Sequence, residues 1–121
     1  MTAFPETTIA HVRAAKATAL AIDADPQYPW TVEGLAAMAG YTYWHFCKVF
    51  ADVNGVAPMG YVRRVRMERA KVLLAGSKLP MKAVARACGY GAPNFAKHFR
   101  REVGVSPTEF RAAAAAGGGG R

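Results

Sequence analysis

LAAMAGYTYWHFCKVFADVNGVAPMGY (residues 35–61) and VARACGYGAPNFAKHFRREVGVSPTEF (residues 84–110) follow one pattern without a gap, and the second copy lies 49 residues after the first. A register kept over this length predicts one supersecondary unit that is used twice. Two copies are too few for a stacked solenoid, which needs three or more. The matching residues, identical or similar, are Leu35/Val84, Ala36/Ala85, Gly40/Gly89, Tyr41/Tyr90, Phe46/Phe95, Lys48/Lys97, Phe50/Phe99, Gly55/Gly104, Val56/Val105, Ala57/Ser106, Pro58/Pro107 and Tyr61/Phe110.

Residues that start and end helices divide the chain into about seven helices. Thr31 and Thr42 are typical N-caps, and Pro58 suits the first turn of a helix. Few segments suit strands, so the sequence predicts an all-α fold. Each copy then holds two helices around a glycine turn, which is a helix-turn-helix unit. The expected helices cover residues 7–23, 32–39, 43–54, 58–76, 81–88, 93–103 and a last segment opened by the capping-box sequence at 106–109.

The expected organisation has five parts. The tail is rich in alanine and glycine; its alanines are able to prolong the last helix, whereas Gly117–Gly120 are expected to be disordered. The parts are residues 1–30, an N-terminal helix and linker; 31–57, the first helix-turn-helix unit; 58–76, a long linker helix; 77–111, the second unit; and 112–121, a flexible Ala/Gly tail.

Composition excludes several classes of protein. No apolar run reaches membrane-spanning length, and the N-terminus lacks a basic region followed by an apolar block, so we expect a cytoplasmic protein without a membrane partner. Cys47 and Cys88 are too few for a disulfide framework or a zinc site. The three histidines lack ligand spacing, and neither a nucleophile–base pair nor a phosphate-binding glycine loop is evident. We therefore expect no metal, no cofactor and no enzymatic activity.

The net charge of +8 is unevenly distributed along the chain. Residues 1–57 carry three Lys or Arg against five Asp or Glu, whereas residues 58–121 carry thirteen against three. Such a basic half favours a polyanionic partner. Charge alone does not distinguish DNA from RNA or an acidic membrane.

The second helix of each copy has a polar or exposed face opposite its core face. On a helical wheel of segment 43–54, Trp44, Cys47, Lys48 and Ala51 lie opposite the apolar stripe. In segment 93–103 the opposite face carries Asn94, Lys97 and Arg101, with Arg100 beside them. Side chains of these types suit the DNA major groove: Asn pairs with adenine, Lys reaches guanine, and Trp contacts a thymine methyl group, while Arg holds phosphates.

The linker helix has a length that suits two reading helices. Nineteen residues span roughly 28 Å, and major-groove faces on one side of B-DNA recur about every 34 Å. Its apolar residues offer contacts to both units, and its arginines offer either phosphate contacts or ion pairs with Glu68.

These motifs resemble the DNA-binding domain of the AraC/XylS family of bacterial transcription regulators over Val32–Arg111. The motifs are Leu35-Ala36-x-x-Ala39-Gly40-Tyr41, the Phe46/Lys48/Phe50 spacing, the linker Arg66-Met67-Glu68-Arg69-Ala70-Lys71, and Gly104-Val105-Ser106-Pro107. Trp44-His45 is similar to the pair found in the small stand-alone members of the MarA, SoxS and Rob type. In the second copy the turn before Phe95 is one residue shorter than is usual in the family.

The resemblance implies a sequence-specific regulator, an activator, that places two recognition helices in adjacent major grooves of promoter DNA. It also implies a nucleoid-associated monomer that recruits RNA polymerase. Two alternatives stay open: an adaptor that binds polymerase or another regulator, and a non-specific nucleoid-type DNA binder. The expected DNA contacts are Tyr43, Trp44, Cys47 and Lys48 in the first recognition helix, Asn94, Lys97, Arg100 and Arg101 in the second, and Thr42, Arg63 and Arg64 at phosphates.

Two residues have a competing structural interpretation. Trp44 either contacts DNA or packs under the N-terminal helix. Cys47 is either a small contact residue or, if Lys48 lowers its pKa, a redox-sensitive thiol.

Overall fold

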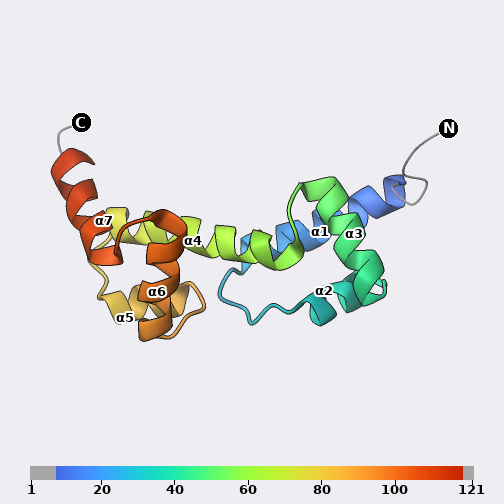
Figure 1. Cartoon of the computed structure of the whole chain (residues 1–121), viewed down its shortest axis with the longest axis horizontal. Coiled ribbons are helices and arrows are strands. Elements are labelled where there is room, and N and C mark those ends of the chain that lie inside the picture. The colour runs from blue at the N-terminus through green and yellow to red at the C-terminus, as the bar shows by residue number, and fades with distance from the viewer. Residues whose placement is uncertain (1–7, 119–121) are drawn as a thin grey trace. The chain divides into compact units, whose positions relative to one another are not determined.

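The computed structural model describes residues 8–118 and contains only helices within that range (Figure 1). The all-α prediction is therefore confirmed for the described part of the chain. The elements are α1 (Ile9–Ala24), α2 (Val32–Ala39), α3 (Tyr43–Asn54), α4 (Pro58–Gly76), α5 (Met81–Ala87), α6 (Ala92–Val103), α7 (Pro107–Ala113) and a closing π-helical turn, η1 (Ala114–Gly118).

Local capping explains these bounds. The hydroxyl oxygens of Thr31, Thr42 and Ser106 accept hydrogen bonds from backbone N–H groups three residues later, at the starts of α2, α3 and α7. These bonds satisfy donors that a helix start leaves unpaired. At the ends of α2 and α3, Gly40 and Gly55 have φ values of 77° and 78°, a left-handed conformation that side chains disfavour. The bounds of α2, α3 and α4 are those predicted, and α6 starts one residue earlier than expected.

The C-terminal tail differs from the prediction. Residues 112–113 end α7, and the following residues continue as η1, so Gly117 and Gly118 are helical instead of disordered. Alanine has the highest helix propensity and no proline interrupts the run, which allows the helix to extend. Residues 119–121 lie outside the described part of the chain, as do residue 7 and those before it.

The chain forms two compact units, Met1–Arg64 and Val65–Arg121, and the boundary falls within α4. In the first unit α1 packs against α2 and α3, and α2 packs against α3. The side chains buried there come from all three helices, from the segment after α1 and from the start of α4. They are Ala15, Thr18, Ala19, Ile22, Pro26, Leu35, Ala36, Phe46, Val49, Phe50, Pro58 and Val62.

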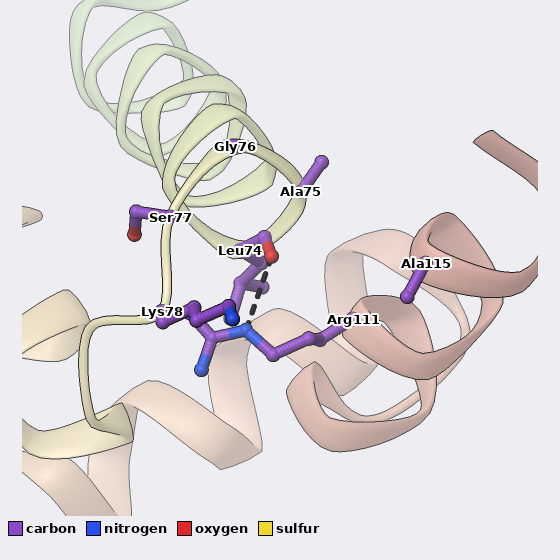
Figure 2. Close-up of a pocket in the computed structure, with 7 residues that line it drawn as sticks. All are labelled: Leu74, Ala75, Gly76, Ser77, Lys78, Arg111 and Ala115. Atoms are coloured by element: carbon purple, nitrogen blue, oxygen red, sulfur yellow. Dashed lines mark hydrogen bonds between the residues drawn. The ribbon is translucent and has the colours of Figure 1, made fainter. Parts of the chain in front are cut away.

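The second unit has its own core. The rest of α4 contributes to it together with α5 and α6, and the buried cluster consists of Met67, Ala70, Leu74, Val84, Ala85, Cys88, Phe95 and Phe99. Arg111 of α7 points toward the end of α4, as Figure 2 shows. Its Nε donates to the carbonyl of Leu74 (3.0 Å) and its Nη1 to that of Leu79 (2.7 Å). These bonds satisfy carbonyls near the end of α4.

A cavity of about 360 Å³ lies beside this contact, between the end of α4 and the start of η1 (Figure 2). Its lining is largely small or apolar, with Ser77, Lys78 and Arg111 as the polar side chains. Arg111 serves as a structural clamp there, because two of its nitrogens already bond backbone carbonyls.

The sequence repeat is a structural repeat. Helices α3 and α6 have the same length and are offset by the 49 residues that separate the sequence copies, and α4 and α7 begin at the matching prolines. The turn bonds recur as well: Tyr41 N donates to Ala36 O, and Tyr90 N donates to Ala85 O, each at 2.9 Å. The same backbone unit therefore occurs twice in the chain. The two copies differ in the side chains that α3 and α6 carry.

Candidate nucleic-acid interface

Helix α3 is held in the first unit by one aromatic face. Phe46 and Phe50 are buried, with ring centroids 5.6 Å apart, and Phe50 lies edge-to-face against Tyr61 of α4 at 5.6 Å. Thr42 caps the helix start through His45 N. This packing turns the opposite face of α3 to solvent, as the helical periodicity predicts.

The outward face of α3 begins with two exposed aromatic rings. Trp44 is 79% exposed and Tyr43 39% exposed, and their ring centroids lie 4.9 Å apart in an edge-to-face arrangement. Trp44 is therefore not packed under α1. Adjacent exposed apolar side chains of this kind form a patch, and contiguous apolar patches mark binding surfaces.

A carboxylate lies beside the lysine of that face. Lys48 Nζ lies 3.5 Å from a carboxylate oxygen of Asp52, one turn along α3. The pKa of the Cys47 thiol is raised, first by burial and second by the negative charge of Glu33. A raised pKa disfavours the reactive thiolate, so the redox interpretation of Cys47 is not supported.

Helix α6 repeats the architecture with different chemistry. Phe95 and Phe99 are buried with centroids 5.7 Å apart, and Phe99 meets Phe110 of α7 at 5.6 Å. The predicted contact residues Asn94, Lys97 and Arg101 are exposed.

Arg100, the fourth predicted contact on α6, lies 3.8 Å from a carboxylate oxygen of Glu109, and both side chains are largely exposed. A pair so exposed is weak and leaves the guanidinium available to another anion.

The predicted phosphate contacts lie at the start of α3 and on α4. Thr42 is exposed and already serves as the N-cap, and Arg63 and Arg64 are exposed on α4. The Arg64 guanidinium lies over the Tyr61 ring, 5.4 Å from its centroid. Further along α4, Glu68 pairs with Lys71 at 3.2 Å.

Two clusters of aromatic side chains were not predicted from the sequence. The rings of His11, Tyr41 and His45 lie within 5.5 Å of one another, centroid to centroid, which links α1 to the start of α3. In the second unit Tyr90 stacks on His98 at 5.2 Å. His11 is far from Tyr41 and His45 in the sequence, and residue spacing alone predicted neither group of rings.

The Tyr90 ring also has the Arg66 guanidinium over it, at 5.4 Å from the ring centroid. Cys88 is fully buried in the core of the second unit, and desolvation raises its pKa to about 11.

Among residues 8–118, no group of three or more His, Cys, Asp or Glu side chains is arranged to hold a metal ion. Within the same range no helix is both long and apolar enough to cross a membrane.

Charge separates the two units. Met1–Arg64 carries five Lys or Arg and five Asp or Glu, whereas Val65–Arg121 carries eleven against three. The whole formal excess of positive charge thus belongs to the second unit. This distribution of charge favours a polyanionic partner at the second unit. In the first unit, the feature that indicates a binding surface is instead the pair of exposed aromatic rings.

Comparison with known proteins identifies the class. Residues 35–113 match the family described as a helix-turn-helix domain. The DNA-binding domain of AdpA, solved in complex with a target DNA, superposes with a TM-score of 0.81 at 30% identity over 85% of this chain and 94% of that one. A probable AraC family transcriptional regulator from Rhodopseudomonas palustris gives a TM-score of 0.70 at 30% identity, over 84% of this chain and 97% of that one.

Two longer relatives agree with this result. The RCS-specific HTH-type transcriptional activator RclR of Escherichia coli is 34% identical over 71% of this chain, and the HTH-type transcriptional regulator Rv1931c of Mycobacterium tuberculosis is 40% identical over 65% of it. The chain spans about a third of the length of these relatives, 31% of each.

The fold and the paired helix-turn-helix units define a DNA-binding domain. More narrowly, the chain belongs to the AraC-type helix-turn-helix family of transcription regulators. That family consists of DNA-binding regulators rather than enzymes, as the sequence predicted.

Proposed function

We propose that the chain binds a specific double-stranded DNA sequence and activates transcription by placing α3 and α6 in adjacent major grooves. The base contacts would come from Tyr43, Trp44, Cys47 and Lys48 on α3 and from Asn94 and Lys97 on α6. The phosphate contacts would come from Thr42, Arg63, Arg64, Arg100 and Arg101.

The observation that carries this proposal is the exposed face of α3. Trp44 is 79% exposed on the helix that corresponds to the reading element of a helix-turn-helix unit, opposite a fully buried aromatic stripe. The relative solved with target DNA supports the same use of the fold.

The proposal extends to the partners of the chain. A relative named as an activator supports activation, which would require contact with RNA polymerase in the cytoplasm. We infer a monomer on an asymmetric site, because the two units differ in their reading side chains and therefore suit two different half-sites.

Selection from random duplex DNA tests this function. The expected result is one enriched motif with two short blocks about one helical turn apart, bound at least about a thousandfold more tightly than a scrambled duplex at physiological salt. Binding without an enriched motif, lost uniformly as salt rises, would instead identify a non-specific nucleoid-type binder.

An adaptor is the second candidate, because the Tyr43–Trp44 pair also suits a protein partner. In that case purified RNA polymerase would bind the chain without DNA, and Trp44→Ala would abolish that binding. Binding of polymerase only in the presence of promoter DNA would favour the activator.

A further inference from the structure

The repeat allows α3 and α6 to be compared position by position. Because the helices share their length and offset, each α3 residue has one counterpart on α6. The buried rings and one lysine are kept, while the exposed residues change in kind. The changed pairs are Tyr43/Ala92, Trp44/Pro93, Cys47/Ala96, Ala51/Arg100 and Asp52/Arg101.

Helix α3 is poorly suited to hold phosphates. Its exposed cation, Lys48, is paired with Asp52 at 3.5 Å, and Asp52 occupies the position that Arg101 has on α6. The carboxylate of Glu33 is close enough to act electrostatically on Cys47 in the same face. Negative charge beside a DNA backbone repels it, so this face gains little from counterion release.

Helix α6 is suited to phosphates. Lys97, Arg100 and Arg101 form an exposed basic run along its outer side, and the unit that contains it carries the whole net positive charge. Its start carries Ala92 and Pro93 where α3 has two aromatic rings, so α6 lacks a comparable apolar surface.

DNA offers an apolar group that suits the aromatic side chains at the start of α3. Tyr43 and Trp44 together present an exposed apolar surface at the end of α3 that begins at the turn. The thymine methyl is the apolar group that the major groove offers, and burying a methyl is insensitive to salt.

We propose that the two recognition helices, α3 and α6, bind DNA by different physical means. Helix α6 supplies the salt-dependent hold on the phosphates, and α3 supplies a salt-insensitive contact between the Tyr43–Trp44 pair and thymine methyl groups. This division rests on the proposed function, since it requires a specific DNA site.

A salt series with the full chain and its selected duplex tests the division. For Arg101→Ala, the slope of log affinity against log salt should become shallower by about one. For Trp44→Ala, affinity should fall about tenfold with the slope unchanged. Asp52→Asn should steepen the slope, because it removes a repulsive charge and releases Lys48.

Matched variants separate these effects from loss of fold or of general charge. Lys16→Ala removes an exposed cation from α1, and Leu20→Ala removes a side chain that is 66% exposed there. Both should leave the slope and the affinity unchanged, and circular dichroism should be the same for all variants.

Replacing each thymine of the site by deoxyuridine, one at a time, identifies the methyl contact. The wild type should lose about fourfold in affinity at a thymine facing α3, and Trp44→Ala should lose nothing further there. Equal slope changes for Trp44→Ala and Arg101→Ala, or no thymine whose methyl effect depends on Trp44, would overturn the division. A motif would still exist in that case, whereas absence of any motif would overturn the proposed function itself.

Discussion

The two helix-turn-helix units are equal in backbone and unequal in surface. Both use a buried pair of phenylalanines, a left-handed glycine after the second helix and a proline at the start of the next. Their exposed faces differ: the first is aromatic and electrically balanced, and the second is basic. This difference indicates that the two copies share the residues that the fold requires, whereas the remaining positions are available for function.

The largest expected effects come from the buried phenylalanines that the two units share. Phe50→Ala and Phe99→Ala each leave a cavity at a matched, fully buried position, so each should cost about 3–5 kcal/mol in free energy of unfolding. Urea unfolding measures this loss. Val72→Ala, at a side chain that is 69% exposed, is the control. A cost below about 1 kcal/mol at one position and not the other would break the equivalence of the two cores.

The glycines that end α3 and α6 should give smaller, equal effects. Gly55 and Gly104 have φ values of 78° and 101°, and an added Cβ at either would meet no atom within 4 Å. Their replacement by alanine should therefore cost roughly 1–2 kcal/mol through backbone strain alone. Gly76→Ala has neither strain nor a clash and should be neutral or slightly stabilising in the same thermal-unfolding experiment.

Glu109 gives the start of α7 a cap that depends on pH. Glu109 accepts a hydrogen bond from Ser106 N at 2.9 Å, and this bond, the largest cause, lowers the pKa of its carboxyl group. A lowered folded-state pKa means that the stabilisation is present above the unfolded-state pKa and is lost as pH falls through the folded-state value.

The stability of the wild type relative to Glu109→Gln should therefore decline between about pH 6 and about pH 3. Thermal unfolding over this range measures the difference. A constant difference would show that the charge of Glu109 has no part in the cap. In the first unit Ala57 and Gly60 occupy the positions of Ser106 and Glu109, so no such cap is available there.

The smallest expected effect on stability comes from a substitution that would give α6 the same kind of N-cap as α3. Helix α3 is capped by Thr42, whereas Gly91 precedes α6 and provides no side-chain cap. Gly91 has an extended backbone with space for a Cβ, so Gly91→Thr should stabilise the chain by a few tenths of a kcal/mol. A loss of stability would mean that the turn before α6 does not accept the geometry found before α3.

Local signals allowed much of the fold to be predicted. Threonine caps, glycine ends and Pro58 determine helix bounds through bonds that span three or four residues, and the predicted bounds of α2, α3 and α4 agree with the structure. Helical periodicity likewise predicted that Trp44 faces outward, because the buried Phe46 and Phe50 define the opposite side.

Contacts between distant residues could not be predicted in this way. The His11–Tyr41–His45 rings and the position of Arg66 over Tyr90 depend on tertiary packing, which spacing does not encode. The prediction that Gly117 and Gly118 are disordered was wrong for a different reason. Glycine was expected to end the helical segment, yet the helix that follows the alanine run continues to Gly118. The DNA contacts themselves remain predictions.

Hydroxyl-radical footprinting of the full chain on its selected duplex tests most directly whether both units contact DNA. We expect two protected blocks about 10 base pairs apart, with Trp44→Ala weakening one block and Lys97→Ala the other. A single block, or the same block weakened by both variants, would show that α3 and α6 do not occupy separate grooves.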